Sequence, residues 1–222
     1  MDAKKIAAEM AAGFVKNEMI VGLGTGSTVF YAIHKLGEMV QQGLKIRTVS
    51  SSIQSEKIAK GLNIPSVEFE EIDHIDIYID GADEVDENFN LIKGGGGALL
   101  REKILAFNSH RYIVVVDESK LVKTLGKFPL PVEVVPFALS LTLSHIRILG
   151  AEVVVRQRDG KDFITDNGNL IADCSFNSIS EPVLLNQRLH EIPGVVETGL
   201  FLSSLVSEVI AGYHDGTAKV IE

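Results

Sequence analysis

The 222-residue sequence is short of cysteine and has no long apolar run, and each shortage excludes a class of protein. Its one cysteine, Cys174, cannot form an internal disulfide, and its setting in ADCSF indicates a small core or surface thiol rather than a nucleophile. No segment approaches the roughly 18 consecutive apolar residues that a membrane span requires. We therefore expect no membrane partner.

Basic residues are outnumbered, with 21 Lys and Arg against 30 Asp and Glu and a net charge of −9. No basic run occurs, which argues against a nucleic-acid partner or an anionic membrane surface. Residues 1–19 mix charged and apolar side chains as an amphipathic helix does, rather than as a signal peptide. With no targeting segment in view, the expected location is cytoplasmic.

Metal-ligand spacing is also missing from the sequence. The six histidines stand at no such spacing from one another or from Cys174; they are residues 34, 74, 110, 145, 190 and 214. The sequence therefore predicts neither a metal site nor a catalytic histidine.

The first half of the chain alternates short apolar segments with segments of helical periodicity, which predicts parallel βαβ units. We expect a Rossmann-like, doubly wound α/β sheet domain. Its expected strands are residues 19–23, 44–49, 75–80 and 112–117, and its expected helices are an N-terminal one, 29–40, 53–60 and one from near Ala98.

A proline-rich segment at residues 126–131 ends this alternation. The order that follows, βαββαβ, predicts a smaller ferredoxin-like α+β domain; its strands are 132–135, 151–156, 170–176 and 195–200, and its helices 137–149 and 182–190. Residues 207–213 and 217–221 read as a hairpin that returns to the first sheet. The predicted domains are residues 1–126 with 201–222, and residues 127–200, the second expected to take part in oligomerisation.

The segment from Asp80 to Lys103, DGADEVDENFNLIKGGGGALLREK, combines acids, a lysine and four consecutive glycines. It follows an expected strand, and ligands of open α/β sheets bind at the carboxyl ends of strands. Backbone N–H groups of Gly94–Gly97 and the start of the next helix can receive an anion. Glu102 lies one turn into that helix, so the segment has the carboxylates and the cation that proton transfer between adjacent carbons needs.

A second glycine loop, Gly22-Leu23-Gly24-Thr25-Gly26-Ser27-Thr28, also lies between a strand and a helix. It lacks the third glycine of the dinucleotide motif and the lysine of a P-loop, so it suits a small phosphate. A plain turn with a helix cap explains it equally well in isolation. One serine of residues 50–52 is expected to cap the next helix. Lys120, past another strand end, fits either a surface position or the same site.

Together these stretches resemble type A ribose-5-phosphate isomerases. The resemblance rests on VGLGTGST, SSS, YIDGADEVD, LIKGGGGALLREK, VDESK, GKFPLPVEVVP, TDNGN and IPGVVETGLF, which cover nearly the whole chain in order. It implies interconversion of D-ribose 5-phosphate and D-ribulose 5-phosphate in the non-oxidative pentose phosphate pathway, without metal or organic cofactor. It also suggests a homodimer or a higher homo-oligomer.

The family's functional positions fall on residues of this chain. The resemblance implies Glu102 as proton acceptor, Lys93 as stabiliser of the developing oxyanion, and Asp83 or Asp80 as the acid that assists ring opening. The implied substrate-binding residues are Thr25, Gly26, Ser27, Thr28, Asp80, Gly81, Ala82, Asp83, Lys93, Gly94, Gly95, Gly96, Lys120 and Lys4. Gly97 departs from relatives, where alanine is common, and we expect no effect on the chemistry.

Two other functions remain possible from the sequence. A non-catalytic sugar-phosphate sensor would share the fold, but it should carry a basic DNA-binding module, and none is visible. An acyl transferase with Glu102 as nucleophile, like the related coenzyme A transferases, would instead form a covalent adduct that can be trapped.

Overall fold

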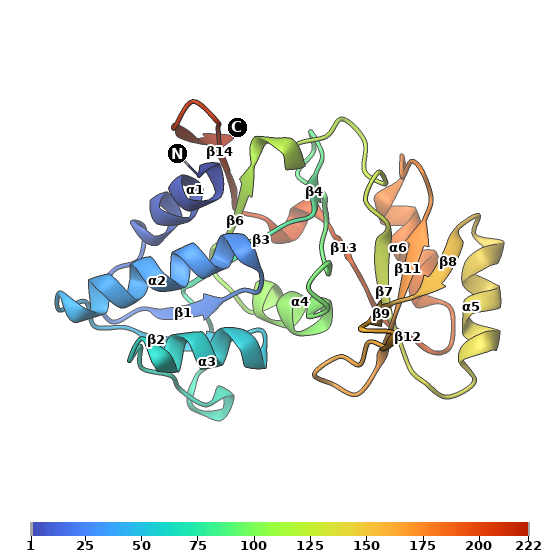
Figure 1. Cartoon of the computed structure of the whole chain (residues 1–222), viewed down its shortest axis with the longest axis horizontal. Helices are drawn as coiled ribbons and strands as arrows, with labels where there is room; N and C mark the ends of the chain where they lie inside the picture. Colours follow the sequence, from blue (N-terminus) through green and yellow to red (C-terminus); the bar gives the residue numbers. More distant parts are fainter. Residues whose placement is uncertain (1, 222) are drawn as a thin grey trace. The chain divides into compact units, whose positions relative to one another are not determined.

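The structure is a computed structural model that describes residues 2–221 (Figure 1). The predicted domain ends Met1 and Glu222 lie outside the described residues. The chain divides into two compact units. Unit 1 contains the residues up to Ala82, Arg101–Lys120 and those from Ser204, whereas unit 2 contains Asp83–Leu100 and Leu121–Ser203.

Unit 1 is built on a six-stranded sheet with the order β15-β14-β6-β3-β1-β2. The five strands from β14 to β2 are parallel to their neighbours, and β15 is antiparallel to β14, so the predicted α/β class and the returning hairpin are confirmed. The strands are β1 (Ile20–Leu23), β2 (Arg47–Ser50), β3 (Ile77–Gly81), β6 (Tyr112–Asp117), β14 (Glu208–Gly212) and β15 (Ala218–Ile221).

The helices of unit 1 agree with the sequence pattern to within about two residues at most ends. They are α1 (Ala3–Ala12), α2 (Ser27–Gln41), α3 (Ile53–Gly61) and α4 (Leu99–Phe107), with short 3-10 turns η1 (Phe69–Glu71), η2 (Glu118–Lys120) and η3 (Ser203–Leu205). The expected serine cap is Ser52, whose hydroxyl accepts from the Ser55 N–H at 3.2 Å. Strand β2 starts later than predicted because Leu44 still bonds to Met39 O and closes the end of α2.

The strand order places the loops that matter for binding. From β2 the parallel strands run β2-β1-β3-β6-β14, so the winding direction changes between β1 and β3. In open α/β sheets this switch point leaves a crevice at the carboxyl ends of the two strands, where ligands bind. Those ends carry Thr25 and Asp80.

Unit 2 contains the predicted βαββαβ order as a four-stranded antiparallel sheet, β12-β7-β11-β8. Its strands are β7 (Leu130–Val134), β8 (Glu152–Val155), β11 (Leu170–Ser175) and β12 (Val195–Thr198), and its helices are α5 (Leu139–Ile148) and α6 (Pro182–His190). Cys174 is buried in β11, so of the two expected settings, core and surface, the core is correct. Burial raises the pKa of its thiol to about 12.

Two smaller sheets complete unit 2 and were not predicted because their strands have two residues each. They are the hairpin β9 (Gln157–Arg158) with β10 (Lys161–Asp162), and the sheet of β4 (Glu84–Val85), β5 (Leu91–Ile92) and β13 (Leu200–Phe201). This second sheet brings Asp83–Leu100 into unit 2, whereas the sequence grouped those residues with the first domain. The division at residues 127 and 200 stays a prediction.

A buried carboxylate explains the turn TDNGN. Glu133 in β7 is fully buried, and its Oε1 accepts from Thr165 Oγ1 (3.0 Å), Asn169 Nδ2 (2.9 Å) and Asn167 Nδ2 (3.2 Å). Because a buried carboxylate is costly without hydrogen bonds, the turn and the strand depend on each other. This motif is therefore structural within unit 2.

Candidate active site

Asp80 is the fixed point of the candidate site in unit 1. Its side chain is fully buried at the end of β3. Its Oδ2 accepts from the Tyr78 hydroxyl at 2.5 Å, and its Oδ1 accepts from the N–H groups of Gly81 (2.8 Å) and Thr25 (3.1 Å). Three donors thus hold one carboxylate and fix the ends of β1 and β3 to each other.

Tyr78 contributes a donor that does not ionise at neutral pH. Burial raises its pKa well above the usual value, and the nearby carboxylates of Asp80 and Glu102 raise it further. The phenol therefore stays protonated and continues to donate to Asp80. Its ring stacks on Tyr112 at a centroid distance of 5.0 Å, which fixes the direction of the hydroxyl.

The loop after β1 is tied to the loop after β2 through Thr25. Its Oγ1 bonds to Ser51 Oγ and Ser52 Oγ, both at 2.8 Å. Gly24 cannot be replaced here, because a Cβ at this position would lie 2.1 Å from Asp80 Oδ1. The exposed residues Gly26 and Ser27 then lead into α2, whose first N–H groups are available to an anion.

Glu102 is a buried carboxylate in the first turn of α4, with only 2% of its surface exposed. Its charge is one of the causes of the raised Tyr78 pKa, so it lies in the electrostatic neighbourhood of Tyr78 and Asp80. The positive end of the α4 dipole stabilises a carboxylate in this position. The expectation that Glu102 lies one turn into the helix is confirmed.

Two lysines complete the candidates of unit 1. Lys4, half-buried on α1, has its Nζ 3.3 Å from Ser27 Oγ at the start of α2. Its neighbour Lys5 is instead near Glu9 at 3.8 Å, so the structure distinguishes the two. Lys120 ends η2, just beyond the carboxyl end of β6, and is partly exposed.

In unit 2 the glycine loop is held from both sides. The Gly95 N–H donates to Asp83 Oδ2 at 2.8 Å, while Arg156 Nη1 donates to the carbonyls of Gly94 (2.7 Å) and Gly95 (3.1 Å). Arg156 is itself fixed by a bidentate pair with Asp173. The loop of four consecutive glycines therefore has a set conformation.

Gly97 is closely packed. Its φ is +86°, and a Cβ there would meet the Phe163 ring at 2.4 Å. The expectation that a glycine here has no effect on the chemistry stays a prediction. An alanine would have to displace Phe163 and adopt a backbone conformation that costs about 1–2 kcal/mol.

The sequence predicts that a loop carries Lys93 and that Lys93 lies outside the core. Lys93 follows β5 directly, which confirms the loop position, but only 3% of its surface is exposed, so the prediction that it lies outside the core is wrong. Its N–H donates to Gly199 O at 2.8 Å, and its Nζ lies 5.4 Å from the centre of the Phe201 ring. An ammonium held over an aromatic face is partly desolvated, which strengthens its interaction with any anion beside it.

Sequence reasoning missed Tyr78, Arg156 and Asp173. Tyr78 sits two residues before Asp80 in an apolar strand, so it read as a core aromatic. Arg156 is 62 positions from Gly94 and 61 from Gly95, Asp173 is farther still, and no local pattern connects them. The one available signal was a charged residue at the end of the apolar run VVVR.

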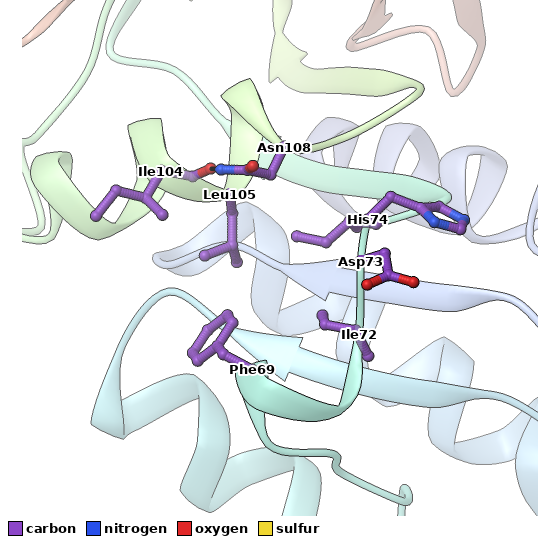
Figure 2. Close-up of a pocket in the computed structure, with 8 residues that line it drawn as sticks. Phe69, Ile72, Asp73, His74, Ile104, Leu105 and Asn108 are labelled. Carbon is purple, nitrogen blue, oxygen red and sulfur yellow. Dashed lines mark hydrogen bonds between the residues drawn. The ribbon is translucent and has the colours of Figure 1, made fainter.

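An apolar pocket with a volume of about 210 Å³ lies elsewhere in unit 1 (Figure 2). Its lining includes Phe69, Ile72, Ile104 and Leu105, and none of the candidate residues. Ile72 precedes β3, so this pocket lies toward the amino ends of the strands. Over residues 2–221, no helix combines the length and the hydropathy needed to cross a bilayer.

Comparison with known proteins gives one consistent result. The family model described as Ribose 5-phosphate isomerase A (phosphoriboisomerase A) matches residues 47–216. The chain is 52% identical over 217 residues to ribose-5-phosphate isomerase A of Bacillus mycoides, covering 97% of this chain and 98% of that protein. The corresponding protein of Sphingopyxis alaskensis is 49% identical over 208 residues, covering 94% and 91%.

Solved structures agree. Ribose 5-phosphate isomerase A of Methanocaldococcus jannaschii superimposes with a TM-score of 0.93 at 41% identity, covering 100% of this chain and 98% of that one. A D-ribose-5-phosphate isomerase in complex with phospho-erythronic acid superimposes with a TM-score of 0.95 at 42% identity, with the same coverage.

The clamp on the glycine loop can be tested by hydrogen exchange. Arg156→Lys keeps a positive charge beside Asp173 but loses the planar guanidinium group that donates to two carbonyl oxygens. Losing a hydrogen bond from a charged group costs about 1.5–3 kcal/mol, so amide exchange at Gly95 and Gly97 should rise roughly 10-fold to 100-fold.

The matched control is Arg147→Lys, which changes another arginine of unit 2 that bonds a backbone carbonyl, Val153 O, at 3.4 Å. Exchange in residues 94–97 should not change in this variant. Unchanged exchange in Arg156→Lys as well would show that the loop does not depend on Arg156.

Proposed function

This chain belongs to the ribose 5-phosphate isomerase A family, and we propose that Glu102 is the base with which it interconverts D-ribose 5-phosphate and D-ribulose 5-phosphate. The observation that carries the proposal is a carboxylate only 2% exposed, at the start of a helix. Shielding from bulk water lets one carboxylate take a proton from carbon and return it to the neighbouring carbon without losing it to solvent.

The proposed steps balance without any further reagent. With the sugar in its open aldehyde form, Glu102 removes the proton on C2, and the electron pair of that bond forms the C1–C2 double bond of an enediolate. The aldehyde oxygen takes the negative charge, for which the ammonium of Lys93 is the proposed stabiliser. Protonated Glu102 then returns the proton to C1, and the proton of the C2 hydroxyl passes to the C1 oxyanion, so that C2 becomes the ketone and the C1 oxygen becomes a hydroxyl.

We assign ring opening to Asp83 rather than Asp80. The three donors on Asp80 belong to the protein and leave it a role in fixing the loops. Asp83 is partly exposed and has one recorded partner, the Gly95 N–H, on Oδ2. A carboxylate with remaining acceptor capacity can receive a sugar hydroxyl proton and pass it to the ring oxygen.

The substrate phosphate is proposed to bind the loop of residues 25–28, at the N-terminus of α2. Lys4 supports this because its ammonium already lies beside Ser27. Gly81, Ala82, Gly94–Gly96 and Lys120 are proposed as the remaining substrate contacts. Binding of the phosphate at a fixed place lets remote binding energy position C1 and C2 at the base.

A relative binds phospho-erythronic acid, a phosphorylated sugar acid. Its carboxylate resembles an enediolate in charge and planarity, so the same class of molecule should inhibit this chain. Nothing in the fold or the relatives favours the sensor function. The non-oxidative pentose phosphate pathway and a cytoplasmic location are proposals that follow from the family.

Removal of the proposed base tests the function. Glu102→Gln should bind ribose 5-phosphate within a few-fold of the unchanged protein and lose about 10²- to 10⁴-fold in turnover. The assay is ketopentose formation by purified protein in excess chelator. Glu87→Gln, at an exposed acid of the same segment, is the control, and near-normal turnover in Glu102→Gln would contradict the assignment.

Ring opening can be separated from proton transfer, because ribulose 5-phosphate is an open-chain ketose. Asp83→Asn keeps an oxygen that can accept from the Gly95 N–H. It should lose most conversion of ribose 5-phosphate, yet still exchange the C1 hydrogen of ribulose 5-phosphate with deuterium from the solvent. Equal loss of both activities would argue against Asp83, and Asp80→Asn should mainly lower stability, by about 1–3 kcal/mol.

We also propose that residues 127–200 form a domain that mediates a homodimer. Exposed apolar side chains support this, because Phe137, Leu141 and Ile148 on and before α5 are 87%, 65% and 77% exposed. Leu141→Glu with Ile148→Glu should yield a monomer in light scattering, while Val183→Glu on α6 should leave the mass unchanged. A monomeric wild type, or an unaffected double variant, would refute this interface.

A further inference from the structure

Two histidines that the sequence keeps apart come together in unit 1. His74 and Asp76 precede β3, and His110 precedes β6. Because β3 and β6 are parallel neighbours, both segments lie at the amino ends of the strands. One nitrogen of each histidine and one oxygen of Asp76 lie within 4.8 Å of one another. The histidines are 36 positions apart in the sequence, which is why no ligand spacing was visible.

The backbone around these side chains is already fixed. The Ile75 N–H donates to Asn108 O at 3.0 Å, and the His110 N–H donates to Ile75 O at 2.8 Å. These two bonds join the segments before β3 and β6 by a parallel bridge. The two histidines are therefore held close by the main chain and do not depend on a ligand to approach each other.

Asp76 is held through both of its oxygens. Its Oδ2 accepts from the Ile20 N–H at 2.7 Å, and its Oδ1 forms a hydrogen bond with His74 Nε2 at 3.3 Å, which a metal ion between the two atoms would replace. In a tetrahedral zinc site with bonds of about 2.1 Å, two ligand atoms are about 3.4 Å apart. This pair of atoms already has that spacing.

The third ligand needs a change of side-chain torsion. The rings of His74 and His110 are stacked, with centroids 4.3 Å apart and planes at 19°. A metal must lie in the plane of each ring that binds it, so nearly parallel rings cannot share one ion. His110 is exposed and can rotate, and Figure 2 shows the His74 ring directed away from the apolar pocket.

The local charge favours a cation. Residues 68–76 contain five acids and no Lys or Arg. The nearest basic side chain along the chain, Arg111, is paired with Glu208 at 2.6 Å. A divalent cation would therefore meet a negative electrostatic potential, because the charge of Arg111 is already balanced by Glu208.

We propose that His74, Asp76 and His110 bind one borderline divalent transition-metal ion, of which Zn²⁺ is the type, with water completing the coordination. Two imidazoles and one carboxylate select such ions over Mg²⁺ and Ca²⁺, which prefer oxygen ligands alone. The site lies at the opposite ends of the strands from Asp80 and Thr25, so the ion joins the segments before β3 and β6 and takes no part in catalysis.

The test is calorimetric titration of ZnCl₂ into the untagged protein. One equivalent should bind to the unchanged chain, and His110→Gln and His74→Gln should each weaken binding by at least about tenfold. His145→Gln, at an exposed histidine of unit 2, should bind as the unchanged chain does. Magnesium should give no heat above dilution.

Thermal unfolding shows whether the ion stabilises the protein by joining the two segments. The thermal midpoint of the unchanged protein should rise with zinc concentration, and that of His110→Gln should not. Isomerase turnover should be the same in both proteins with excess chelator. Absence of zinc binding to the unchanged chain, or binding in His74→Gln and His110→Gln as tight as in the unchanged chain, would overturn the proposal, whatever the isomerase assay shows.

Discussion

The candidate site of unit 1 depends on one buried carboxylate. Asp80 is inaccessible to solvent, and a phenol and two backbone N–H groups donate to its carboxylate, which offsets the cost of burying it. Those bonds fix the loop after β1, and through Thr25 that loop is joined to the serines after β2. Asp80 therefore holds the carboxyl ends of three strands in one arrangement.

In unit 2 a cationic side chain, Arg156, fixes a loop, as the anionic Asp80 does in unit 1. Glycines are needed where backbone must approach a ligand, but they add freedom that a binding site cannot use. Arg156 removes that freedom by bonding two consecutive carbonyls, and Asp83 takes the Gly95 N–H. Two charged side chains thus fix the conformation of the glycine loop.

The sequence pattern sufficed for β6, whose apolar run is buried along its whole length, and for α6, whose bounds match those of the predicted helix. The motif loops were also placed, since they follow strand ends in a parallel sheet. The contacts that the sequence did not predict join residues that are far apart in the chain. They are Phe163 packed on Gly97, Arg156 bonded to the glycine loop, and His110 stacked on His74. Patterns of neighbouring residues cannot predict contacts between segments that are distant in the sequence. Tyr78 was missed for a different reason. Its hydroxyl bonds Asp80 on the same strand, and the apolar pattern of that strand gave no sign of the bond.

The interrupted course of the chain has a consequence for biosynthesis. Strand β6 is fully buried, and β14, which covers one of its edges, comes ninety residues later, after all of unit 2 from Leu121 to Ser203. A ribosome adds about 5–20 residues per second, so the apolar edge of Tyr112–Asp117 stays unpaired for several seconds. Unpaired apolar edges invite association with other chains. Nascent chains of this protein should therefore be most vulnerable to aggregation, and most in need of chaperones, while unit 2 is being synthesised.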